Sequence, residues 1–170
     1  MNELELNEEE FRGSRPGLLT VLCVLSFIST GLGIISALFN FVAGPQSDEK
    51  LLDAKVALTK STSELKDLGM DLFVEIMEKI QRMTEQVNEN FYLASIVNLI
   101  AVAIGLFGAI KMWQGVKIGF HLYIGYCLLT IAGLYIYVSP ENIPTVVVVL
   151  NLIVSAIFIF LYSRNLKWMR

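Results

Sequence analysis

Four long stretches of the chain carry no charged side chain. They are bounded by Arg15 and Asp48, by Glu89 and Lys111, by Lys117 and Glu141, and by Glu141 and Arg164. Each is predominantly apolar and about 20 residues or longer, and a helix of that length spans a hydrocarbon core of about 30 Å. A soluble helix needs a polar face, and these stretches offer none. The pattern predicts an all-α integral membrane four-helix bundle.

The spans and the segments between them divide the whole chain. The predicted transmembrane helices cover 17–43, 92–112, 116–138 and 143–163, with an acidic tail at 1–16, an amphipathic helical segment at 44–91 and a basic tail at 164–170. A cleaved signal peptide is the alternative for the first span. Its leader "MNELELNEEEFRGSR" has five Glu against two Arg, whereas signal peptides have a positively charged leader. We therefore expect a retained anchor.

The basic residues beside the spans all fall on one side of the predicted bundle. They are Arg12, Arg15, Lys111, Lys117, Arg164, Lys167 and Arg170. The opposite short connection, "SPEN", has no Lys or Arg, and the long segment 44–90 balances six basic residues with ten acidic ones. Lys and Arg in short loops set the orientation of a membrane protein. We expect both termini in the cytoplasm and the segment 44–91 outside it.

The segment 44–91 is predicted to hold two helices. Gly44 and Pro45 end the first span, and Ser47 or Asp48 can cap a new helix that runs to about Lys60. The stretch "KSTSELKDL" then predicts a joint, because Ser61 and the Glu three residues later have capping-box spacing.

After that joint, apolar side chains recur at gaps of three and four. The stripe consists of Leu65, Leu68, Leu72, Ile76, Ile80, Met83 and Val87. Charged residues repeat with the same gaps on the other face, as in an amphipathic helix. Neither Gly nor Pro interrupts the sequence between Met70 and Tyr92. This predicts one continuous helix from about Thr62 to Met112, whose outer part stands above the membrane as a stalk.

The apolar stripe of the stalk needs a cover, and three covers fit the sequence. The first outer helix could fold back to form a helical hairpin, with Leu51, Leu52, Val56 and Leu58 against the stripe. That helix is too short to cover it all, so a partner protein or a second copy could bind the rest, as in a coiled coil. The outer lipid surface is the third alternative, although surface-lying helices favour Lys and Arg on their polar face.

Polar residues inside the spans are uncharged. They include Asn40, Asn98, Asn151 and Ser155. Such side chains can form interhelical hydrogen bonds, or they can line a polar pocket or path. Small residues also recur at gaps of four and three, at 26, 30, 33 and 37 of the first span and at 94, 98, 101, 105 and 108 of the second. We expect these two spans to pack through those faces.

The composition and the absence of known motifs from the sequence limit the functions that we expect of the chain. The chain is 55% hydrophobic and 17% charged, with a mean hydropathy of +0.61. Apart from Lys111 and Lys117 at the ends of two predicted spans, no charge lies inside a span, although intramembrane charges mark most proton pumps and ion-coupled transporters. Zinc-protease, hydrolase and phosphate-loop motifs are absent from the sequence, so we expect no enzyme, cofactor or metal. The lone His121 and the two cysteines, Cys23 and Cys127, are predicted to pack, and basic residues are too scattered for nucleic-acid binding.

The stretches "RPGLLTVLCVLSFISTGLGIISAL" and "MWQGVKIGFHLYIGY" resemble small four-span bacterial membrane proteins of unknown function, in which a long outer segment separates the first span from three others. The resemblance implies a location in the inner membrane of a bacterium. The predicted function is that of a non-enzymatic accessory or scaffold subunit. Its partners would be the lipid bilayer and either a membrane or extracytoplasmic protein or a second copy of this chain. The alternative is a small oligomeric transporter or channel with the Asn residues along a polar path.

Overall fold

The protein is described here by a computed structural model that covers residues 15–170, and this range holds helices and connections but no strand. Four helical segments are long and apolar enough to cross a membrane. They are α2 (Gly17–Ala43), α5 (Phe91–Trp113), the segment Ile118–Tyr137 that combines α6 (Ile118–Ala132) with α7 (Leu134–Tyr137), and α8 (Thr145–Ser163). The all-helical class and the four candidate spans are confirmed. The predicted acidic tail lies outside the described residues except for its last two.

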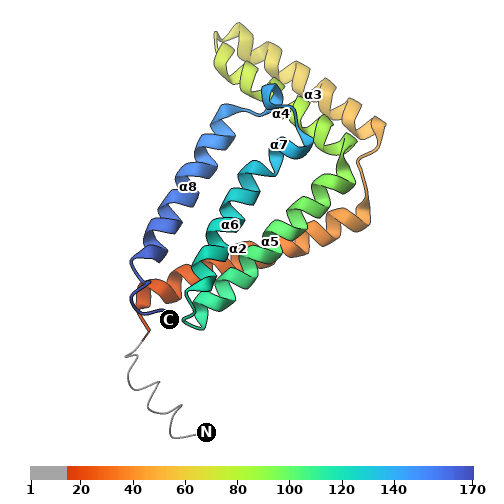
Figure 1. The fold of residues 1–170 in the computed structure, drawn as a ribbon. Helices are drawn as coiled ribbons and strands as arrows, with labels where there is room; N and C mark the ends of the chain where they lie inside the picture. Colours follow the sequence, from red (N-terminus) through yellow and green to blue (C-terminus); the bar gives the residue numbers. More distant parts are fainter. Residues whose placement is uncertain (1–14) are drawn as a thin grey trace, which may run out of the picture.

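The remaining long helices form an antiparallel pair. α3 (Asp48–Asp67) and α4 (Asp71–Glu89) lie side by side across one end of the candidate spans (Figure 1). α4 also contacts the short helix η1 (Pro140–Asn142). The start of α2 and the C terminus lie at the opposite, terminal end (Figure 1). The predicted stalk is therefore wrong, because α4 lies over the bundle and does not extend away from it.

The predicted joint near Ser61 is also wrong, since α3 continues to Asp67. The hydroxyls of Ser61, Thr62 and Ser63 each donate to a carbonyl three or four residues earlier, which a helix accommodates. The break comes at Gly69, whose φ of 72° is in the left-handed region that favours glycine.

Two backbone hydrogen bonds close this turn. Gly69 N donates to Lys66 O at 3.0 Å, and Met70 N donates to Leu65 O at 3.0 Å. This is the Schellman arrangement, in which a glycine after the last helical residue lets the chain satisfy the final carbonyls.

A second break separates α4 from α5 at Asn90, although the sequence there has neither Gly nor Pro. The Asn90 side-chain nitrogen donates to Gln86 O at 3.1 Å and to Tyr137 O at 3.2 Å. A short amide side chain that bonds nearby backbone competes with the helical ladder. The bond to Tyr137 adds a tertiary contact that fixes the bend.

Small residues bring α2, α5 and α6 close together, as the sequence predicts for the first two spans. A Cβ on Gly33 of α2 would lie 2.9 Å from Val102 Cγ1, and one on Gly105 of α5 would lie 3.2 Å from Thr30 Cγ2. The α5–α6 contact is tighter: a Cβ on Gly119 would lie 2.6 Å from Gly108 O. Close backbone approach of this kind holds membrane helices together by van der Waals contact.

The densest core lies at the terminal end. It contains Leu19, Leu22, Cys23, Met112, Phe120, Tyr123, Cys127, Tyr162 and Met169. The predicted basic tail folds back onto this core: Arg170 N donates to Gly115 O at 2.8 Å, and Lys117 N donates to Arg170 O at 2.7 Å. Arg15 stacks on Trp113, with its guanidinium carbon 3.9 Å from the ring centroid.

Candidate functional site

Three amide side chains at the end of α4 join the α3–α4 pair to the bundle. They alternate along the stretch "QVNEN" as Gln86, Asn88 and Asn90. Gln86 makes two bonds to Ser139: its Nε2 donates to Ser139 Oγ at 3.1 Å, and its Oε1 accepts from Ser139 N at 2.9 Å. A primary amide has both donors and an acceptor, so the Gln86 side chain can bind Ser139 at two points, its hydroxyl and its backbone N–H.

Asn88 makes the same kind of double contact with the α2–α3 connection. Its Oδ1 accepts from Gln46 N at 2.7 Å, and its Nδ2 donates to Gln46 O at 3.1 Å. With the bond from Asn90 to Tyr137 O, α4 is tied to two connections that lie far away in sequence. The sequence analysis missed these residues, because nothing in local spacing shows which loop an amide will meet.

A pocket lies beneath this junction, with a volume of about 320 Å³. It is lined by Ala37, Asn40, Gly44, Gln46, Thr84, Val87, Asn88, Phe91, Ala94, Ser95, Asn98 and Tyr137. We call it the amide pocket. Among residues 15–170, none of those that line it is charged.

Two of the predicted polar residues meet in the amide pocket. Asn40 from α2 and Asn98 from α5 both line it, and neither side chain has a hydrogen-bond partner within the described part of the chain. Asn151 and Ser155 lie elsewhere, in a smaller pocket of about 130 Å³ between α2, α6 and α8. Asn151 Nδ2 donates to Val147 O of its own helix at 2.9 Å.

The predicted apolar stripe does not lie on one helix. Leu65 belongs to α3 and Leu68 to the turn at Gly69, whereas Leu72, Ile76, Ile80, Met83 and Val87 belong to α4. The left-handed turn at Gly69 is the physical reason for the division. Ile76, Met83 and Val87 are half-buried, and Val87 lines the amide pocket.

The exposed apolar part of α4 includes two residues that the sequence analysis left out. Leu72, Phe73, Met77 and Ile80 are 67%, 53%, 37% and 40% exposed. We call these four residues the α4 face. Phe73, Met77 and Ile80 fall at helical spacings of four and three, so they share one side of the helix.

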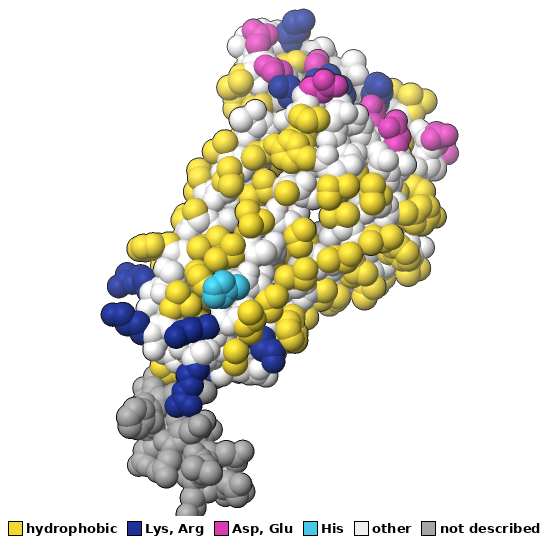
Figure 2. Space-filling model, viewed as in Figure 1, with side chains coloured by type: hydrophobic (Ala, Val, Ile, Leu, Met, Phe, Trp, Pro, Cys, Tyr) yellow, Lys and Arg dark blue, Asp and Glu magenta, His cyan; other side chains and the backbone are white. Residues whose placement is uncertain are grey.

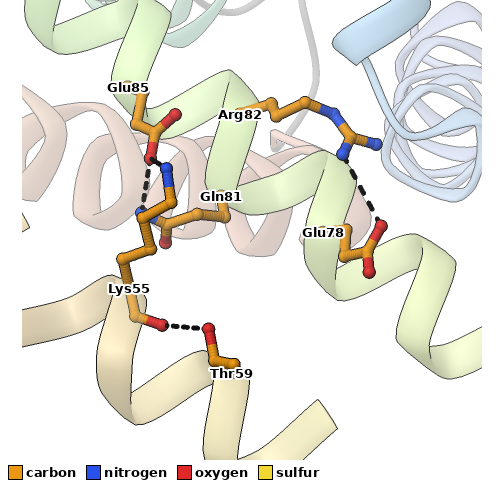
Figure 3. Close-up of polar contacts among 6 residues, drawn as sticks. All are labelled: Lys55, Thr59, Glu78, Gln81, Arg82 and Glu85. Atoms are coloured by element: carbon orange, nitrogen blue, oxygen red, sulfur yellow. Dashed lines mark hydrogen bonds and ion pairs between the residues drawn. The ribbon is translucent and has the colours of Figure 1, made fainter. Parts of the chain in front are cut away.

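α3 contacts α4 on a different side. Lys55 of α3 forms an ion pair with Glu85 of α4 at 3.4 Å, and Gln81 Nε2 donates to the same carboxylate at 3.2 Å (Figure 3). Of the four residues that the hairpin alternative placed against the stripe, Leu52 and Val56 are 61% and 63% exposed, whereas Leu51 and Leu58 are half-buried. α3 therefore leaves the α4 face uncovered.

The acidic side chains gather at one end of the molecule, whereas basic side chains lie at both ends (Figure 2). Every Asp and Glu among the described residues lies in the α3–α4 pair or in η1. Arg15, Lys111, Lys117, Arg164, Lys167 and Arg170 lie at the terminal end, as Figure 2 shows for that face of the molecule. Between the two ends, the surface in Figure 2 is largely apolar.

The described residues contain no group of three His, Cys, Asp or Glu side chains that could hold a metal ion. Comparisons of the chain with models of protein families, with characterised proteins and with solved structures each give no match. The features of the described residues that bear on function are the amide pocket, the α4 face and the distribution of charge.

Proposed function

We propose that the protein is a multi-pass integral membrane protein that serves as a non-enzymatic accessory or scaffold subunit. Its α3–α4 pair lies on the extracytoplasmic side and binds a partner protein through the α4 face. The basic terminal end supports this orientation, because Lys and Arg beside membrane spans favour the cytoplasmic side. The apolar belt between the two charged ends is what a bilayer would cover.

The observation that carries the proposal is an apolar face that is fixed in place and left uncovered. α3 occupies another side of α4, and Gln86, Asn88 and Asn90 tie the helix to the bundle. An exposed apolar patch on a structured element is typical of a protein-binding surface. Amphipathic helices commonly present such faces to a groove or helix of a partner.

The test introduces a carboxylate at the centre of the α4 face. Ile80→Asp and Met77→Asp should each weaken the complex at least about tenfold, because burying an unpaired charge is unfavourable. Ala57→Asp is the matched control: it adds the same charge at an exposed position of α3.

The measurement is quantitative capture of the complex from native membranes after cross-linking, with the membrane content of each variant checked. A complex that survives both Ile80→Asp and Met77→Asp would rule out the α4 face as the contact. Loss of the complex in Ala57→Asp as well would point to a general effect of charge on the α3–α4 pair.

A second candidate function is a small oligomeric transporter or channel. It is favoured by the pocket between α2, α6 and α8, where Ser26, Thr30, Asn151 and Ser155 place uncharged polar groups among apolar spans. Asn98→Leu combined with Asn151→Leu should abolish solute flux into proteoliposomes if this is the function. Unchanged flux in that variant would exclude a path along these residues.

A further inference from the structure

The amide pocket is lined by polar side chains that make no hydrogen bond within residues 15–170, and two of them, Asn40 and Asn98, are exposed. Among residues 15–170, the side chains of Asn40, Asn98, Ser95 and Tyr137 line the pocket without a hydrogen-bond partner. They come from three different helices, α2, α5 and α7. Amides and hydroxyls that converge on one space from several elements are the usual polar component of a ligand site.

The walls of this pocket are fixed by contacts that do not use these groups. Asn88 and the backbone of Gln46 form one side through their two hydrogen bonds. The bond from Asn90 to Tyr137 O connects the start of α5 to the end of α7. A pocket held open in this way does not need to be ordered by the ligand, which reduces the entropy lost on binding.

The uncharged lining of the pocket, among the described residues, indicates a neutral ligand. Glu85 and Glu89, which flank Gln86 and Asn88 along α4, line a separate pocket between α3 and α4. Within the described chain, the amide pocket therefore offers no counter-charge. An ion that entered it would lose hydration without an opposite charge to replace it, which is unfavourable.

The lining also indicates a ligand with both donors and acceptors. An apolar ligand would remove water from Asn40 and Asn98 and leave their amides unpaired, at a free-energy cost. A hydroxyl group both donates and accepts hydrogen bonds, as a primary amide does, so hydroxyls of the ligand can bond to these amide side chains. Ala37, Val87, Phe91 and Ala94 supply apolar surface for the carbon skeleton of such a ligand.

We propose that the amide pocket binds a neutral, hydroxyl-rich group of about the size of a monosaccharide. The volume of about 320 Å³ is at the lower end of the range for small-molecule pockets. Two sources supply this chemistry: a free sugar, and the uncharged sugar headgroup of a lipid. The site is independent of the proposed partner binding, because no residue of the α4 face lines it.

The experiment is saturation-transfer NMR on the full chain in phosphatidylcholine nanodiscs, with three sugars of one ring type that differ in charge. Methyl glucoside is neutral, glucosamine is cationic and glucuronate is anionic. We expect transfer to methyl glucoside and at least about tenfold weaker binding of the two charged sugars. Nanodiscs that also contain a monoglucosyl diacylglycerol distinguish the sources: a lipid ligand lowers the transfer to free methyl glucoside by competition.

Variants assign the binding to the pocket. Asn40→Leu and Asn98→Leu should each weaken the binding of methyl glucoside about five- to tenfold, the effect of losing one or two neutral hydrogen bonds. Both side chains lack protein partners, so these changes are compatible with folding. Asn142→Leu is the matched control, since it replaces an amide of η1 that does not line this pocket.

The proposal is overturned by any of three results. They are no transfer to methyl glucoside in either kind of nanodisc, equal binding of a charged sugar, and full binding by the Asn40→Leu and Asn98→Leu variants while they remain folded. None of these results bears on the capture experiment with Ile80→Asp.

Discussion

At the scale of single residues, the junction depends on side chains that look unremarkable in the sequence. Asn88 lies in a charged amphipathic stretch, where an amide is easily taken for a solvent-facing residue. In the structure it binds both backbone groups of Gln46, 42 positions earlier. Asn40 and Asn98 stand out in the sequence as polar residues within apolar runs, and they do meet in one pocket. What surrounds them could not be predicted, because it depends on connections that are distant in sequence.

The first prediction concerns Asn88. Asn88→Leu removes both hydrogen bonds to Gln46, so we expect local opening of the α2–α3 connection to become easier by about 1 kcal/mol, or about fivefold. Amide hydrogen exchange at residues 46–50 measures this change. Asn151→Leu should leave exchange in that segment as it is in the wild type. Unchanged exchange in Asn88→Leu would show that these two bonds do not hold the connection.

The second prediction compares two glycines of α6. A Cβ on Gly119 would lie 2.5 Å from Met112 N and 2.6 Å from Gly108 O, and these backbone atoms cannot move aside easily. We therefore expect Gly119→Ala to lower the free energy of unfolding by about 1–3 kcal/mol. Gly125 has no atom within 4 Å of the same position.

Gly125→Ala is the control for this comparison. It should leave stability unchanged or raise it by up to about 1 kcal/mol, because alanine favours a helix over glycine. Denaturation of the two variants in the same detergent measures the difference. Equal stabilities would contradict the close approach of α5 and α6.

At the scale of helices, charge gaps and periodicity predict which segments are helical, but they do not predict where the amphipathic helix ends. The capping-box spacing at Ser61 suggested a boundary, whereas the chain breaks at Gly69, where the backbone adopts a left-handed φ. The bend at Asn90 has no signal of Gly or Pro. It follows from a side chain that bonds Tyr137 O across the bundle, so tertiary structure decides it.

The third prediction tests this bend. Glu75 and Lys111 are 36 positions apart, so one continuous helix would separate them by about 54 Å. The bend predicts a clearly shorter separation. Spin labels at these two exposed or half-exposed positions allow the distance to be measured by pulsed electron resonance. A distribution of label-to-label distances centred at about 54 Å would contradict the bend and support the straight helix that the sequence predicts.

At the scale of the whole molecule, the four uncharged stretches and the position of the basic residues already predict the architecture. The structure adds that the spans are unequally packed. In the most apolar part of α8 only 6% of the residues are buried, against 33% in α5. The sequence alone could not predict this difference, since both helices are equally free of charge in their centres. The sequence predicts a stalk that projects from the bundle, whereas in the structure the α3–α4 pair lies over one end of the bundle (Figure 1).

We propose that the α3–α4 pair lies on the extracytoplasmic side of the membrane and the basic terminal end on the cytoplasmic side. Labelling of single cysteines in intact cells with a membrane-impermeant maleimide distinguishes the two sides. Ser63→Cys places a thiol on the exposed surface of α3, and Lys167→Cys places one at the terminal end. The native Cys23 and Cys127 are buried, so the wild type gives the background.

With this orientation, we expect Ser63→Cys to be labelled in intact cells and Lys167→Cys to be labelled only after the membrane is permeabilised. The reverse pattern would contradict the proposed orientation, and with it the extracytoplasmic position of the α4 face. Labelling of both positions in intact cells would contradict a protein whose apolar helices cross the membrane with the two ends on opposite sides.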